Sequence, residues 1–168
     1  MIIWVGRSES LREGAQSSSV YCGLRPTPLF RYNKPMIKQT GRIIIPANVN
    51  IWPHELCTAQ ALATVGYTVE FVPPANTEGN HTADVLLDGV PWEFKAPKSG
   101  QLDAIERNLK KGSKQSGRIV FDSRRMKRIP DKVIARELAT RLKKQRTLAA
   151  IIFVNRHGTV IDIAPVSD

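Results

Sequence analysis

Two acidic residues and a lysine flank a predicted β-turn. Asp88-Gly89, between two apolar segments, is the strongest short signal for a β-hairpin. A two-residue turn here fixes the strand register, so Asp84 faces Glu93 with about 4.5–5.5 Å between their Cβ atoms. Lys95 lies beside Glu93, because side chains two residues apart in a strand point to the same face. The spacing therefore gathers two carboxylates and one ammonium on one face of the hairpin, opposite its apolar face.

Two facing carboxylates repel each other unless a positive group or a proton lies between them. A bound divalent cation, a shared proton or the Lys95 ammonium can each relieve the repulsion. A cation held by Asp84 and Glu93 would be a hard ion such as Mg²⁺, because the ligands are oxygens. Lys95 would then orient or deprotonate an attacking water, or stabilise the charged transition state at phosphorus. The structural alternative is a solvent-facing hairpin with a cross-strand salt bridge from Lys95.

The positive charge of the chain lies almost entirely in its second half. The 168 residues carry a net charge of +10. Residues 1–90 contain seven basic and seven acidic residues, whereas residues 91–168 contain 18 basic and eight acidic ones. Such a localised field attracts polyanions and speeds their association, which favours a nucleic-acid ligand. The alternative is a solvated basic surface that serves only solubility.

The candidate nucleic-acid contacts lie on a predicted basic helix and in a basic loop. In the helix predicted for residues 102–116, basic and polar residues recur every four positions, away from the apolar stripe. The loop follows a predicted strand over residues 118–122, and its arginines suit bidentate phosphate contacts. Few aromatic residues lie nearby, which favours recognition of the backbone and shape of a folded RNA or a duplex. The candidates are Arg107, Lys111, Lys114, Arg124, Arg125 and Lys127.

The pattern after residue 50 predicts a single α/β domain with a central mixed β-sheet flanked by helices. Residues 1–50, rich in Ser, Gly and Pro, are interpreted as a partly ordered N-terminal arm or linker, with one short apolar strand signal near residue 43. Periodicity and turn residues predict helices over 53–65, 102–116 and 130–144 and strands over 67–72, 82–87, 90–96, 118–122, 148–154 and 159–163.

Several functional classes are excluded by composition. No apolar run approaches the roughly 20 residues that span a bilayer, and the N-terminus lacks the basic leader of a secretory signal. We therefore expect a soluble chain without a membrane segment. Two cysteines do not make a disulfide framework, and the three histidines are too scattered for a zinc cluster.

The spacing Asp84-x8-Glu93-x-Lys95 resembles the Asp…Glu-x-Lys core of the PD-(D/E)XK nucleases. The predicted order of helix, strand, hairpin and helix is also that of the family, although Ala83 stands where the family often has proline. The resemblance implies a PD-(D/E)XK-like fold, with Asp84 and Glu93 as metal ligands and Lys95 as a catalytic residue. It also suggests Gln115, on the next helix, as a supporting catalytic residue, and Glu55 on the first helix as a further acid.

A longer run resembles the toxin domains at the C-termini of CdiA contact-dependent inhibition proteins. The similar segments are residues 83–98, 105–116 and 119–122, within a match over roughly 54–163. The resemblance implies that residues 51–168 are a nuclease domain that cleaves tRNA in the cytoplasm of a bacterium, after delivery from a secreted parent protein. It also implies a cognate immunity protein, which would be acidic if it covers the basic half.

The resemblance leaves the mechanism open. A metal-dependent PD-(D/E)XK nuclease would use a divalent metal such as Mg²⁺ as its cofactor. In the alternative, an α+β fold of the barnase and colicin type, the 2′-hydroxyl of the RNA attacks the phosphate and no cofactor is needed. Glu93 and Lys95 fit either mechanism, whereas Asp84 has a clear role only in the first. Two other functions stay open: a DNA endonuclease of the PD-(D/E)XK class, and a non-catalytic nucleic-acid-binding protein.

Overall fold

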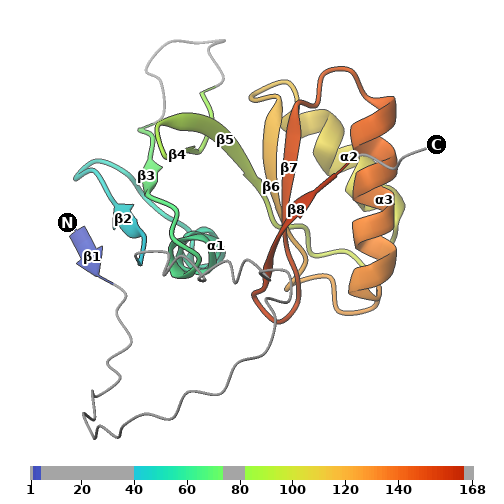
Figure 1. The fold of residues 1–168 in the computed structure, drawn as a ribbon, viewed down its shortest axis with the longest axis horizontal. Coiled ribbons are helices and arrows are strands. Elements are labelled where there is room, and N and C mark those ends of the chain that lie inside the picture. Colours follow the sequence, from blue (N-terminus) through green and yellow to red (C-terminus); the bar gives the residue numbers. More distant parts are fainter. Residues whose placement is uncertain (1, 5–39, 74–81, 165–168) are drawn as a thin grey trace, which may run out of the picture.

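Eight strands and three helices form one curled α/β layer structure in the computed structural model, which describes residues 2–4, 40–73 and 82–164 (Figure 1). The strands are hydrogen-bonded in chain order from β1 to β8. They are β1 (Ile2–Trp4), β2 (Arg42–Ile44), β3 (Val69–Phe71), β4 (Val85–Leu87), β5 (Val90–Lys95), β6 (Arg118–Asp122), β7 (Ala150–Val154) and β8 (Val160–Ile163). The helices are α1 (Pro53–Thr64), α2 (Asp103–Gly112) and α3 (Asp131–Lys144). The predicted single α/β domain with a mixed sheet and flanking helices is confirmed.

The sheet is mixed because hairpins and helical crossovers alternate along the chain. β3, β4 and β5 form an antiparallel meander, and β7 and β8 form a terminal hairpin. β5, β6 and β7 are parallel neighbours. Parallel neighbours need a long connection, which α2 provides between β5 and β6 and α3 between β6 and β7.

Helices cover both faces of the central strands, so alternate residues of each strand enter different cores. Ile119 and Phe121 of β6 pack with α2 and α3, whereas Val120 between them packs on the opposite face with α1. β5 pairs in register with β6, with Glu93 opposite Ile119 and Phe94 opposite Val120. Glu93 and Lys95 therefore lie on the face covered by α2, and Phe94 lies in the α1 core.

The predicted helix over residues 102–116 ends earlier than expected. α2 stops at Gly112, and the backbone N–H groups of Gln115 and Ser116 both donate to the Gly112 carbonyl at 2.9 Å, which closes a turn. Gln115 therefore lies in this turn and not on the helix. Glycine is a weak helix former, and Gly112 is also closely packed, because a Cβ there would lie 2.9 Å from Ile119 Cδ1 of the neighbouring strand.

The predicted arm, residues 1–50, differs from the structure at two strands. β1 pairs antiparallel with β2, and β2 pairs parallel with β3, so both extend the sheet of the domain. Ile43 is fully buried in the core beneath α1, because its apolar run supplies a side chain to that face. The sheet thus begins before residue 51, while residues 5–39 lie outside the described part of the chain.

A buried ion pair joins α1 to the end of β6. Asp122 is 2% exposed, and its Oδ2 lies 2.6 Å from the Thr58 hydroxyl of α1. Arg124 Nε donates to both oxygens of Asp122 at 3.0 Å, and the Arg124 backbone N–H donates to Oδ1 at 2.9 Å. The hydrogen bond with Asp122 raises the pKa of the Arg124 guanidinium, and burial acts in the opposite direction.

We predict that Arg124→Met destabilises the fold more than Asp122→Asn. The first change leaves a buried carboxylate without its cation, which costs about 3 kcal/mol. The second leaves only a partly exposed guanidinium, which water can solvate, and costs about 1–2 kcal/mol. Urea unfolding measures both, with Lys127→Met at an exposed position as a control expected within about 0.5 kcal/mol of wild type. An equal effect of Arg124→Met and Lys127→Met would contradict the structural role of this pair.

Candidate functional site: a buried carboxylate pair beside a basic groove

The hairpin has the register expected from its turn. Asp88 and Gly89 have φ values of 48° and 81°, the positive values that a two-residue hairpin turn requires. Val85 pairs with Trp92 and Leu87 with Val90. Just before β4, Asp84 Oδ2 accepts a hydrogen bond from the Phe94 backbone N–H at 2.8 Å. This bond holds the Asp84 carboxylate next to the Glu93 side chain.

Glu93 is buried with only one of its two carboxylate oxygens paired. The residue is 1% exposed, and Oε1 accepts a hydrogen bond from Lys95 Nζ. Oε2 is buried and has no hydrogen-bond partner among the described residues. Lys95, whose side chain is 18% exposed, also lies 3.5 Å from Gln115 Oε1. The structural alternative of a solvent-facing hairpin is therefore wrong for Glu93, although the salt bridge that it expected from Lys95 to Glu93 is present.

The environment of Glu93 raises the pKa of its carboxyl group toward neutral pH. Burial raises the pKa of Glu93 from 4.5 to about 7. The hydrogen bond from Lys95 opposes this shift, and the negative charge of Asp84 adds to it. A carboxyl group with this pKa is present in both protonation states near neutral pH, as a general base or a proton-releasing ligand requires.

Gly112 allows α2 to lie directly over the carboxylate pair. A Cβ at this position would lie 3.2 Å from Lys95 Cε and 3.4 Å from Glu93 Cγ, besides its clash with Ile119. The turn after the helix is fixed to the hairpin by the Ser116 hydroxyl, which donates to the Pro91 carbonyl at 3.1 Å. Residues 112–116 therefore enclose the pair and bring Gln115 to it. The predicted contact group of Asp84, Glu93, Lys95 and Gln115 is brought together.

The six predicted nucleic-acid contacts have different environments. Lys111, Lys114 and Lys127 are exposed. Arg107 is exposed and paired with Asp103 one helical turn earlier. Arg124 is taken up by the buried pair with Asp122, and Arg125 Nη1 donates to the Ala96 carbonyl at 3.0 Å.

Glu55, suggested as a further acid, has a local structural role. Its carboxylate accepts the Trp52 backbone N–H at 3.0 Å, which caps the start of α1.

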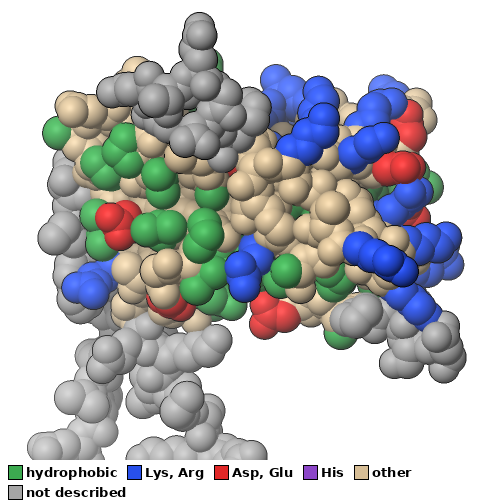
Figure 2. Space-filling model, turned by 90° about the horizontal axis from the view of Figure 1, so that it is seen from above, with side chains coloured by type: hydrophobic (Ala, Val, Ile, Leu, Met, Phe, Trp, Pro, Cys, Tyr) green, Lys and Arg blue, Asp and Glu red, His purple; other side chains and the backbone are tan. Residues whose placement is uncertain are grey.

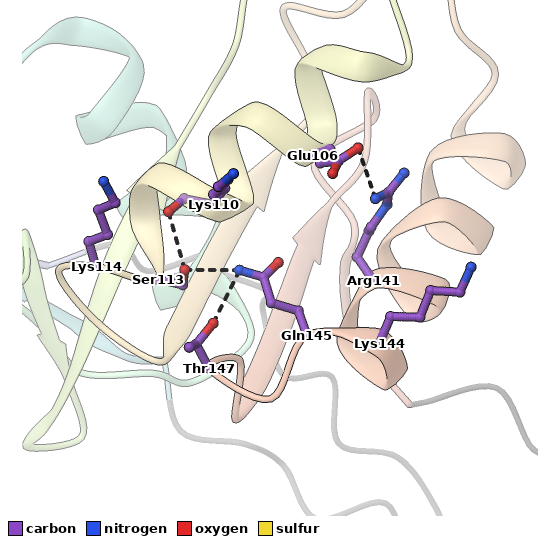
Figure 3. Close-up of a pocket in the computed structure, with 8 residues that line it drawn as sticks. All are labelled: Glu106, Lys110, Ser113, Lys114, Arg141, Lys144, Gln145 and Thr147. Carbon is purple, nitrogen blue, oxygen red and sulfur yellow. Dashed lines mark hydrogen bonds and ion pairs between the residues drawn. The ribbon is translucent and has the colours of Figure 1, made fainter.

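A basic groove of about 670 Å³ lies between the C-terminal ends of α2 and α3; we call it the α2–α3 groove (Figure 3). It is lined by Glu106, Lys110, Ser113, Lys114, Arg141, Lys144, Gln145 and Thr147. The α2 and α3 half of the molecule carries most of the Lys and Arg side chains on the face shown in Figure 2. Sequence analysis found only Lys114 of this set, because the groove forms where two helices distant in the sequence end side by side.

The residue set offers few metal ligands. Among the described residues no group of three or more His, Cys, Asp or Glu side chains forms a metal cluster. Asp84 and Glu93 are the two neighbouring carboxylates that could hold a hard cation such as Mg²⁺, which needs only one or two carboxylates besides water or phosphate oxygens.

A protein-family model matches the segment that contains the candidate site. Residues 81–160 match the model described as "Contact-dependent growth inhibition CdiA C-terminal domain". This segment is similar to that family over slightly less than half of the chain. It includes the hairpin, α2, β6, α3 and β7, and thus all the candidate residues from Asp84 to Lys127.

A solved structure shares the fold of this chain. One chain of the "CdiA-CT/CdiI toxin and immunity complex from Burkholderia pseudomallei" matches with a TM-score of 0.53 and 19% sequence identity. The match covers 73% of this chain and 99% of that one. No curated protein sequence matches the chain significantly. In the described residues, none of the helices is both long and apolar enough to cross a membrane.

We predict that removing the Glu93 charge stabilises the folded protein at neutral pH but not in acid. The folded state holds a proton on Glu93 that the unfolded chain releases, so wild-type stability falls as pH rises from 4.5 to about 7. Glu93→Gln lacks this loss. Its advantage in free energy of unfolding grows by about 3 kcal/mol between about pH 4 and about pH 8 in EDTA.

Urea unfolding across this pH range measures the difference, and Asp162→Asn at an exposed carboxylate is the control. A parallel pH profile for Glu93→Gln and wild type would show that the Glu93 carboxyl titrates normally.

Proposed function

We propose that this chain is the toxin module of a contact-dependent growth inhibition system, and that it is a metal-dependent nuclease that cleaves tRNA. The observation that carries the proposal is the buried, unpartnered Oε2 of Glu93 beside the Asp84 carboxylate. An unsatisfied buried charge is costly, and Lys95 occupies only the other oxygen. A ligand that binds both carboxylates would remove this cost.

Asp84 and Glu93 fit a divalent cation of the magnesium type, because hard ions prefer oxygen ligands and are often held by two carboxylates and substrate phosphates. Such an ion would neutralise charge on the phosphate and lower the pKa of an attacking water. Lys95 lies next to this pair, where its ammonium stabilises negative charge on the phosphate oxygens. Gln115 contacts Lys95 Nζ and holds it in place.

The chemistry is hydrolysis of one phosphodiester bond. The oxygen of water forms a bond to phosphorus, the bond from phosphorus to the leaving oxygen breaks, and the leaving oxygen is protonated. Lys95, as an ammonium with 18% of its side chain exposed, is placed to contact the reacting phosphate from the open side. Buried Glu93 orients Lys95 through the hydrogen bond from Nζ to Oε1.

A second mechanism is favoured by the pKa of Glu93 near 7. A carboxylate with this pKa suits proton transfer at neutral pH, so Glu93 can accept the proton of an attacking RNA 2′-hydroxyl. Lys95 then stabilises the charged phosphate, and no metal is needed. The presence of Asp84 supports the metal version over this one, because Asp84 raises the electrostatic cost of the pair without any role in 2′-hydroxyl attack.

The substrate and partner follow from charge and from the relatives. A net charge of +10 that lies beyond residue 90 favours a polyanion, and the scarcity of exposed aromatic side chains there favours a folded RNA. The Burkholderia relative is a toxin in complex with an immunity protein. We infer an acidic immunity protein for this chain, delivery from a secreted parent, and action in the cytoplasm of the target bacterium.

We predict that Glu93→Gln, Asp84→Asn and Lys95→Met each lower tRNA cleavage at least about 100-fold, the size expected when charge stabilisation or acid–base catalysis is lost. Total bacterial tRNA is incubated with purified protein in Mg²⁺ or EDTA, and products are resolved on denaturing gels. Asp162→Asn is the control at an exposed carboxylate and should cleave like wild type.

The outcomes separate the alternatives. Loss of cleavage in EDTA and in Asp84→Asn supports the metal-dependent site. Cleavage that survives both changes but not Glu93→Gln supports 2′-hydroxyl attack. Cleavage of duplex or branched DNA without cleavage of tRNA would replace the RNA substrate and keep the nuclease. Nucleic-acid binding without cleavage of any substrate would contradict the nuclease proposal.

A further inference from the structure

The α2–α3 groove has a rigid polar floor between two helix ends. Gln145 Nε2, after α3, donates to Ser113 Oγ, after α2, at 3.0 Å and to Thr147 Oγ1 at 3.1 Å. Ser113 Oγ donates in turn to the Lys110 carbonyl at 3.2 Å. Figure 3 shows these bonds as one chain across the groove. The floor is thus fixed before any ligand binds, so little side-chain entropy is lost there on binding.

The charge of the groove is positive and mostly uncompensated. Its lining includes four basic side chains and one acidic one. Arg141 is neutralised within the protein, by Glu106 at 2.8 Å and Glu137 at 2.6 Å. Lys110, Lys114 and Lys144 are exposed and form no ion pair within the described residues.

Helix electrostatics explain only part of this pattern. Basic residues are favoured in the last turn of a helix, which accounts for Lys110 and Lys144. Lys114 lies beyond the end of α2, and it still lines the same groove. That three lysines without an ion pair line one hollow therefore needs a further reason, and an anionic ligand supplies it.

The groove and the carboxylate site share one short segment of chain. Gly112 packs on Lys95 and Glu93, Ser113 and Lys114 line the groove, and Gln115 reaches back to Lys95. This short segment of chain therefore connects the groove to the carboxylate site. The groove volume is within the range of about 300–1,000 Å³ that holds small organic ligands, which is room for sugar-phosphate units.

We infer that the α2–α3 groove binds the phosphodiester backbone of the nucleic acid on one side of the scissile bond. This inference rests on the proposed nuclease function and adds the path of the substrate to it. Lys110, Lys114 and Lys144 contact successive phosphates, and the polar floor positions the strand without reading base sequence.

The test compares two triple substitutions that remove the same charge. The groove variant is Lys110→Gln, Lys114→Gln and Lys144→Gln. The matched control is Lys98→Gln, Lys132→Gln and Arg136→Gln, at exposed positions that do not line the groove. Both are made in the full chain carrying Glu93→Gln, which blocks cleavage. Binding of fluorescently labelled tRNA is measured by anisotropy over a series of salt concentrations.

We expect the groove variant to lower the slope of log K against log salt by about 2–3, because each lost phosphate contact releases about one counterion fewer. The control should retain the parent slope within about 1 unit. Circular dichroism checks that all three proteins melt at the same temperature.

Equal slopes for the two triple variants would overturn the inference, because binding would then depend on total charge and not on the groove. An unchanged slope for the groove variant, with the wild-type protein still cleaving tRNA, would overturn the inference and leave the proposed function intact. Absence of both tRNA binding and cleavage in wild type would overturn both. If the groove variant retained tRNA binding but lost binding to polyglutamate, a simple model of an acidic protein, the groove would be assigned to an acidic protein partner. This result would also overturn the inference.

Discussion

The burial of Glu93 against Lys95 beneath α2 is the constraint on which the site depends. A carboxylate at the protein surface would be solvated and would have an ordinary pKa. Here the helix covers it, one oxygen is held by Lys95, and the other has no partner among the described residues. Gly112 favours this arrangement, since a Cβ there would lie 2.9 Å from Ile119 Cδ1 and 3.2 Å from Lys95 Cε, and these side chains would have to shift. The turn after the helix brings Gln115 to Lys95.

The alternation of the sheet allows the site to coexist with a continuous core. On β5, Phe94 enters the α1 core while its neighbours Glu93 and Lys95 face α2. β6 follows the same pattern, with Ile119 and Phe121 on the α2 face. Glu93 and Lys95 therefore take the place of two apolar residues on one face of the sheet only. The loss of apolar burial is local, and strands β6 and β7 retain both cores around it.

The sequence predicts this hairpin well because its information is local. Asp88-Gly89 sets the turn, the turn sets the register, and the register places Asp84 by Glu93. Helix starts were also local signals, as Pro53 at the start of α1 shows. The end of α2 was placed four residues too late, although Gly112 is a local signal that weakens a last turn.

Tertiary contacts also explain why the basic residues were harder to assign. In the sequence, Arg124 and Arg125 lie in a basic stretch that is typical of a phosphate-binding loop. Arg124 instead pairs with Asp122, and Thr58, 64 residues earlier in the chain, completes that pair. The α2–α3 groove forms where the C-terminal ends of two separate helices lie side by side, so no short stretch of sequence shows it, and Lys114 was the one groove lysine named from the sequence.

The two buried acids on opposite faces of the sheet differ in how completely the fold satisfies their oxygens. Asp122 and Glu93 are 2% and 1% exposed, so both have lost nearly all contact with water. Both oxygens of Asp122 are satisfied, by the Arg124 side chain and backbone and by the Thr58 hydroxyl. Glu93 keeps one oxygen unpaired and a second carboxylate beside it. Burial alone does not separate the two acids, since both are buried. The unsatisfied oxygen does, because its cost can be relieved only by a proton shared with Asp84 or by a bound ligand.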